Sequence, residues 1–147
     1  MQLCPECGYA SSDISAIHED ASDCIATPDY QRQRFDSATP EIARPFLCYA
    51  LILNHVKQYA DAGWIALQAA WACDDAGDDV SAQRARLLAI DYWKHGKRHG
   101  QPFGELAEEF ALATDVLRRA GKFEEALVTC TSRGGIRAGT DWMRCRA

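Results

Sequence analysis

The segment Leu117-Arg118-Arg119-Ala120-Gly121-Lys122-Phe123-Glu124-Glu125-Ala126 decides the fold, because it joins two helical patterns through one tight turn. Gly121 has access to the left-handed backbone that often ends a helix, so it marks the turn itself. Ala126 supplies the small side chain that two closely crossing antiparallel helices need. Before the turn, apolar residues recur on one helical stripe: Leu106, Phe110, Ala113, Leu117 and Ala120. The segment therefore predicts a helical hairpin over residues 105–132.

Start signals for two earlier helices lie upstream. Thr27-Pro28 and Thr39-Pro40 each place an N-cap residue before a proline at the first helical position. The first predicts a short helix. The second predicts a long helix with apolar residues from Ile42 to Ala60 in phase, and Pro45 is expected to delay its start by a turn.

A second hairpin is predicted over residues 64–95. We expect Gly63 to break the chain, and the next helix carries Trp64, Leu67 and Trp71 on one face. Gly77 then closes the turn before the following helix. Together these patterns predict a single all-α domain of antiparallel helical hairpins over residues 1–147. It divides into a zinc knuckle with an irregular lead-in (1–26), the helical hairpins (27–132) and an irregular tail that folds back (133–147).

Composition and charge narrow the class of partner. The chain has 147 residues and a formal net charge of −5, a balance that repels phosphate backbones and disfavours nucleic acid as a partner. Its longest apolar run, Phe46 to Leu53, is far too short to span a membrane. The N-terminal residues lack the pattern of a signal peptide, so we expect a cytoplasmic protein without membrane contact.

The most specific motif is Cys4-Pro5-Glu6-Cys7-Gly8-Tyr9. A C-P-x-C-G turn presents two thiolates from one tight loop, and its glycine permits the backbone conformation that directs amide groups at the sulfurs. Such a knuckle supplies half of a tetrahedral zinc site. A thiol-exchange role is the alternative, but it usually places the pair after a strand and at a helix N-terminus, and no strand is predicted before Cys4.

The other two zinc ligands have to be chosen among five further cysteines and four histidines. Cys48 and Cys73 lie within apolar helical stretches and are expected in the core. The preferred set is Cys4, Cys7, Cys130 and Cys145, a four-thiolate site that would tie the two chain ends together. The competing set is local and uses His18 and Cys24, whose spacing from Cys4 and Cys7 suits a zinc finger.

The hairpin around Gly121 resembles the turn and second-helix start of a tetratricopeptide repeat. The knuckle, the stretch Ala69-Ala70-Trp71-Ala72 and the 117–126 hairpin together resemble uncharacterised prokaryotic proteins that join a zinc knuckle to tetratricopeptide-like helices. The likeness covers about residues 3–131. Trp64 and Phe110 are 46 residues apart, whereas a regular array repeats every ~34 residues, so a generic helical bundle stays the alternative. The resemblance implies an architecture and no activity.

No catalytic constellation stands out in the sequence. There is no G-x-S-x-G, no GKS or GKT phosphate loop and no H-E-x-x-H. A fully thiolate zinc site is closed and structural by type. We therefore expect a non-catalytic, zinc-stabilised helical-repeat scaffold for a protein partner. The alternatives are a metal- or redox-responsive regulator acting through Cys4 and Cys7 and, less in keeping with the motifs, a zinc enzyme; the oligomeric state stays open.

Overall fold

The computed structural model describes residues 1–13, 15 and 18–131, and the chain is mainly helical there. This confirms the predicted all-α class of the fold. One two-stranded antiparallel ribbon was not predicted: it pairs Gln2 with Ser11 and Leu3 with Ala10. In chain order the elements are β1 (Gln2–Leu3), β2 (Ala10–Ser11), α1 (Ala21–Ile25), α2 (Pro28–Arg34), α3 (Arg44–His55), α4 (Tyr59–Asp75), α5 (Asp79–Arg98), α6 (Leu106–Arg119) and α7 (Phe123–Thr131).

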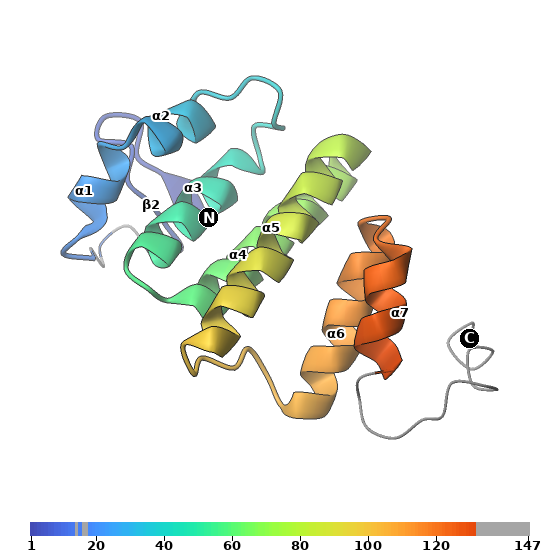
Figure 1. The fold of residues 1–147 in the computed structure, drawn as a ribbon. Coiled ribbons are helices and arrows are strands. Elements are labelled where there is room, and N and C mark those ends of the chain that lie inside the picture. Colours follow the sequence, from blue (N-terminus) through green and yellow to red (C-terminus); the bar gives the residue numbers. More distant parts are fainter. Residues whose placement is uncertain (14, 16–17, 132–147) are drawn as a thin grey trace.

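The helices from α3 onward pack in chain order, each against the next (Figure 1). The largest contact joins α4 to α5, and α6 pairs with α7. Helices α1 and α2 and the strand β2 pack against α3, on the side away from α6 and α7. Both predicted hairpins are therefore present, although the first begins at Tyr59 instead of Trp64. None of the helices in the described ranges is long and apolar enough to cross a membrane.

The two predicted start signals have different outcomes. Thr27 caps α2 as predicted, because its side-chain oxygen accepts a hydrogen bond of 3.3 Å from the backbone N–H of Tyr30. Thr39 does not open a helix; its hydroxyl donates to the Asp36 carboxylate at 2.6 Å. Helix α3 begins at Arg44, with Pro45 in its first turn, so the expected delay is confirmed.

Gly63 does not break the chain, and that prediction was wrong. It lies inside α4, where a Cβ atom would come 2.3 Å from Cδ1 of Trp93. The Trp93 indole thus packs directly against the α4 backbone, and its Nε1 donates a hydrogen bond of 3.2 Å to the carbonyl oxygen of Ala60. The glycine is present to admit an aromatic ring, not to end a helix.

An aromatic cluster joins the two hairpins. Trp93 is 2% exposed and stacks on Phe103, with the ring centroids 4.3 Å apart. Trp64 meets Trp93 edge-on at 5.5 Å, and its Nε1 donates a hydrogen bond of 2.9 Å to the carbonyl oxygen of Phe103. Because Phe103 belongs to the connection between α5 and α6, these contacts hold the second hairpin against the first.

Candidate metal centre and exposed surfaces

The two predicted knuckle cysteines lie together on the turn between β1 and β2. The backbone N–H of Cys4 donates to the carbonyl oxygen of Tyr9 at 2.8 Å, and the N–H of Gly8 donates back to the carbonyl of Cys4 at 3.0 Å. Gly8 has φ +80°, a left-handed conformation that glycine adopts without strain. This closed turn sets the spacing of Cys4 and Cys7.

The turn favours a thiolate at Cys4. The backbone N–H of Cys7 is the largest cause of a lowered pKa for the Cys4 thiol, followed by the Cys7 side chain and the N–H of Glu6. Cys7 itself is exposed and Cys4 is partly buried. A thiolate that accepts several amide hydrogen bonds at the surface is suited both to metal ligation and to thiol chemistry.

Helix α2 fixes this turn to the helical body. The Tyr30 hydroxyl, fully buried, donates a hydrogen bond of 2.6 Å to the carbonyl oxygen of Gly8. The Arg34 guanidinium donates to the carbonyl oxygen of Pro5, also at 2.6 Å. The same guanidinium lies 5.0 Å from the ring centroid of Phe35, which is 67% exposed. A positive charge and an exposed aromatic ring therefore adjoin the cysteine turn.

The local ligand set is not assembled. Cys24 lies buried against Tyr30 and Cys48, and burial raises the pKa of its thiol to about 11, which disfavours the thiolate that a metal needs. His18 donates its backbone N–H to the Tyr9 hydroxyl, and its ring lies 6.3 Å from that of Tyr49.

The two cysteines predicted in the core are indeed buried. Cys48 and Cys73 are both fully shielded from solvent. Burial is the largest influence on each thiol and raises its pKa to about 11. Neither is therefore suited to hold a metal as a thiolate.

The predicted end-to-end set is not brought together by the described residues. Cys130 lies in α7, which packs on α6, and α4 and α5 separate it from the cysteine turn (Figure 1). Cys145 lies outside the described residues. Across residues 1–13, 15 and 18–131, no three His, Cys, Asp or Glu side chains are grouped as metal ligands.

Cys130 is partly buried on α7. Of the apolar residues at helical spacing before it, Ala126 is buried. Phe123 and Leu127 are 62% and 59% exposed. The rest of the protein therefore covers Ala126 and leaves Phe123 and Leu127 exposed.

Two histidines, His95 and His99, lie at the C-terminal end of α5. Gly96 does not interrupt α5, which continues to Arg98. The rings of His95 and His99 stack with centroids 4.6 Å apart, and Tyr59 lies 4.4 Å from the first of them. Nδ1 of His99 lies 2.9 Å from the carbonyl oxygen of His95. The ring contacts of Tyr59, His95 and His99 hold the end of α5 against the start of α4. Within the described ranges, these histidines belong to no group of three possible metal ligands.

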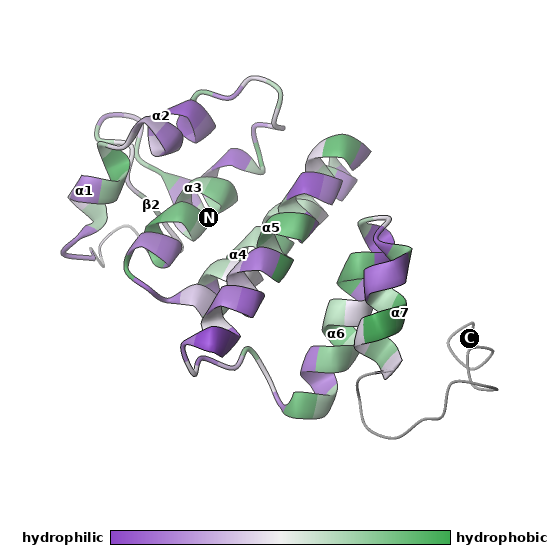
Figure 2. Cartoon of the chain, viewed as in Figure 1, coloured by the Kyte–Doolittle hydropathy of each residue, from purple (hydrophilic) through white to green (hydrophobic). Residues whose placement is uncertain are grey.

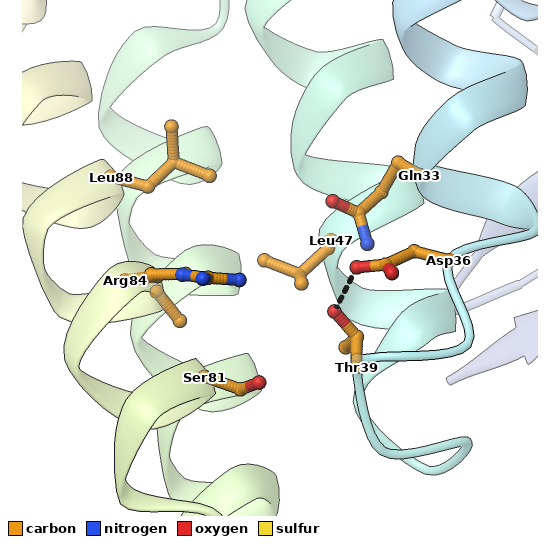
Figure 3. Close-up of a pocket in the computed structure, with 8 residues that line it drawn as sticks. Gln33, Asp36, Thr39, Leu47, Ser81, Arg84 and Leu88 are labelled. Carbon is orange, nitrogen blue, oxygen red and sulfur yellow. Dashed lines mark hydrogen bonds between the residues drawn. The ribbon is translucent and has the colours of Figure 1, made fainter.

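A small hollow lies between α5 and the end of α2 (Figure 3). Arg84 reaches into it from α5, and Gln33 faces it from α2, with Leu47 behind them. Its volume is ≈ 130 Å³, room for roughly four water molecules at ~30 Å³ each and below the usual ~300–1,000 Å³ of a ligand pocket. We assign it no ligand.

The exposed apolar residues of α7 form what we call the α7 stripe, and Figure 2 shows hydrophobic residues in this helix. Phe123, Leu127 and Val128 are all 59–65% exposed. Glu124 and Glu125, in the first turn of the same helix, give its start a negative charge. An exposed group of large apolar side chains on the last described helix is typical of a surface that another polypeptide covers.

Comparison of the chain with family models, with curated proteins and with solved structures finds no match.

Proposed function

We propose that the protein is a zinc-stabilised helical scaffold that holds another polypeptide and has no catalytic activity of its own. One observation carries this proposal: two thiols, Cys4 and Cys7, share one turn whose amide groups favour a thiolate, and α2 fastens that turn to the helices. Zinc–thiolate knuckles of this kind stabilise folds.

Zinc would act here through structure, not through chemistry on a substrate. Cys4 and Cys7 would hold the ion as thiolates, and zinc would contribute the free energy of its ligation to folding. The protein would hold the two sulfur atoms at the spacing of one turn, and hydrogen bonds from α2 would hold that turn in place. Loss of zinc should therefore loosen β1, β2 and α2 first.

The binding role rests on the helical hairpins and on the α7 stripe. We infer that the hairpins are of tetratricopeptide-like type, since consecutive helices pack in chain order and Ala126 is buried where α7 meets the rest of the protein. The occupant that fits the stripe is an amphipathic segment with Lys or Arg beside its apolar face. Such a segment would cover Phe123, Leu127 and Val128 and place its positive charges near Glu124.

A labelled amphipathic peptide of leucine and lysine tests this surface. Fluorescence anisotropy should show binding to the full chain and a loss of at least tenfold in affinity in Leu127→Glu. Ile42→Glu is the matched control, because Ile42 is also 61% exposed but lies just before α3, whose main helical partner is α4. Equal binding by both variants would show that α7 is not the docking surface.

The lowered pKa of the Cys4 thiol also supports a second candidate, a thiol-based redox regulator. In that case a two-electron oxidant such as hydrogen peroxide would take two electrons and two protons from the Cys4 and Cys7 thiols to form a disulfide and water, and a thiol reductant would reverse the step. Mass spectrometry after mild oxidation distinguishes the two. The scaffold proposal expects zinc to protect both thiols from oxidation, whereas a regulator would lose its zinc and gain the disulfide under the same conditions.

A further inference from the structure

In the function proposed above, the cysteine turn supplies half of a zinc site. A structural zinc ion takes four ligands in a tetrahedral arrangement, and Cys4 and Cys7 supply two. No third donor joins them within residues 1–13, 15 and 18–131. Positions 14, 16 and 17 are Ile, Ala and Ile, which have no ligating side chain. In a four-ligand site, the other two ligands would then come from residues 132–147 or from another molecule.

The chain's own last segment offers a poor match. Within residues 132–147 the side chains able to ligate zinc are those of Asp141 and Cys145. With Cys4 and Cys7 they would give three thiolates and a carboxylate, whereas structural zinc sites typically have four cysteines, three cysteines and one histidine, or two of each. A four-thiolate site within one chain would also need Cys130, and α7 holds that residue on the other side of α4 and α5 from the turn. Cys24, Cys48 and Cys73 are buried in the protein.

We propose that zinc binds between two copies of this chain, each of which contributes Cys4 and Cys7. The proposal rests on the zinc-binding part of the function proposed above and names the partner at that site as a second copy. A second copy can reach the turn, because the turn joins two short strands and its Cys7 is exposed. Two such turns related by a two-fold axis would surround one zinc ion with four thiolates.

Two neighbouring residues fit this arrangement. A zinc ion with four thiolates carries a net charge of −2, and the Arg34 guanidinium beside Pro5 in each copy would offset it. Phe35 follows Arg34 and is 67% exposed, a large apolar side chain next to the turn that a second copy would cover. The charge and the exposed ring lie on α2 and its C-terminal end, the element that also anchors the turn.

The test uses the full chain purified without chelator. Light scattering after size exclusion should give twice the 16.3 kDa of one chain, and elemental analysis should give one zinc per two chains. A strong chelator should halve the mass. Cobalt(II) in place of zinc should give the absorption of a tetrahedral four-thiolate site.

Two matched variants separate the sources of the ligands. Cys7→Ser should be a zinc-free monomer. Circular dichroism should show that it keeps most of its helix content, because α3 to α7 pack on one another and the loss of zinc loosens only β1, β2 and α2. Cys145→Ser should remain a zinc-bridged dimer. One zinc per monomeric chain would overturn the bridge and leave zinc binding itself intact, and a dimer that survives the chelator would also overturn it. Absence of zinc from the wild-type protein would refute both the bridge and the zinc-stabilised function.

Discussion

The Tyr30 hydroxyl donates a hydrogen bond of 2.6 Å to the carbonyl oxygen of Gly8, and this contact joins α2 to the cysteine turn. The bond is buried, and burial is the largest cause of a raised pKa for the Tyr30 hydroxyl, so the group stays a hydrogen-bond donor over the physiological pH range. The stability of the turn and that of α2 are therefore coupled through one side chain.

Tyr30→Phe should destabilise the protein by about 1–2 kcal/mol, because the Gly8 carbonyl would lose its buried partner. Urea unfolding followed by circular dichroism measures the effect. Tyr49→Phe is the control, since Tyr49 packs against the same cluster and no hydrogen bond of its hydroxyl occurs within the described residues. An equal cost for both variants would mean that the Tyr30 hydrogen bond adds nothing.

Gly63→Ala should destabilise the protein by about 1–3 kcal/mol or more, because the new methyl group would overlap the Trp93 indole. This reverses the usual sign, as alanine inside a helix is normally favoured over glycine by ~1 kcal/mol. Thermal unfolding of the variant measures the change. A stabilised Gly63→Ala protein would contradict the close packing of Trp93 on α4.

Ala126→Trp should also destabilise by about 1–3 kcal/mol, through overpacking of a buried site on α7. Val128→Trp is the control, because Val128 lies on the same helix and is 65% exposed. Denaturant unfolding should therefore distinguish the two substitutions. A neutral Ala126→Trp would mean that α7 does not pack closely there.

Glu109 should make stability depend on pH in the acidic range. It accepts hydrogen bonds from the Phe103 N–H at 2.7 Å and from Lys97 at 2.8 Å. Burial acts to raise the pKa of the Glu109 carboxyl, but these hydrogen bonds outweigh it, so the pKa lies below the ordinary 4.5. The unfolded chain then takes up the proton more readily, and the stabilisation present above about pH 4.5 is lost as pH falls through the folded-state pKa.

Glu109→Gln removes this titration and tests its sign. The variant should be less stable than wild type near neutral pH by about 1–2 kcal/mol, and the gap should narrow at acidic pH. Chemical unfolding at a series of pH values gives both numbers. Glu124→Gln, a change at an exposed carboxylate, is the control. A gap that stays constant with pH would contradict the assigned role of Glu109.

Helical periodicity predicted which residues share a face but not whether another element covers that face. It placed Leu67 and Trp71 together, yet Leu67 is buried and Trp71 is 50% exposed. The same limit applies to Phe123 and Leu127 on α7, which end in solvent in the described part of the chain. Whether a helix face is buried depends on tertiary packing, and the spacing of residues within one helix does not predict that packing.

Local signals were most reliable where one residue determines the backbone. Gly77 and Gly121 close their hairpins with φ +73° each, as their positions after a helix predicted. Gly63 failed as a break because its role is to admit Trp93, a partner 30 positions away in the sequence. The strand before Cys4 was missed because two residues are too few for any periodic pattern.

The spacing of Cys4 and Cys7 correctly predicted that they share one turn. Spacing in the sequence did not identify the other ligands of the proposed zinc site. Spacing within a turn is a local property. Which distant cysteine faces a metal depends on the packing of whole helices, and α7 carries Cys130 away from the turn.

Zinc content of the purified protein tests the central claim most directly. Elemental analysis of wild-type protein prepared without chelator should find bound zinc, and the same preparation of Cys4→Ser should contain none. Cys73→Ser changes a buried thiol whose pKa is raised to about 11, and it should keep its zinc wherever circular dichroism shows it folded. Wild-type protein without zinc, or a Cys4→Ser protein that retains it, would contradict the account.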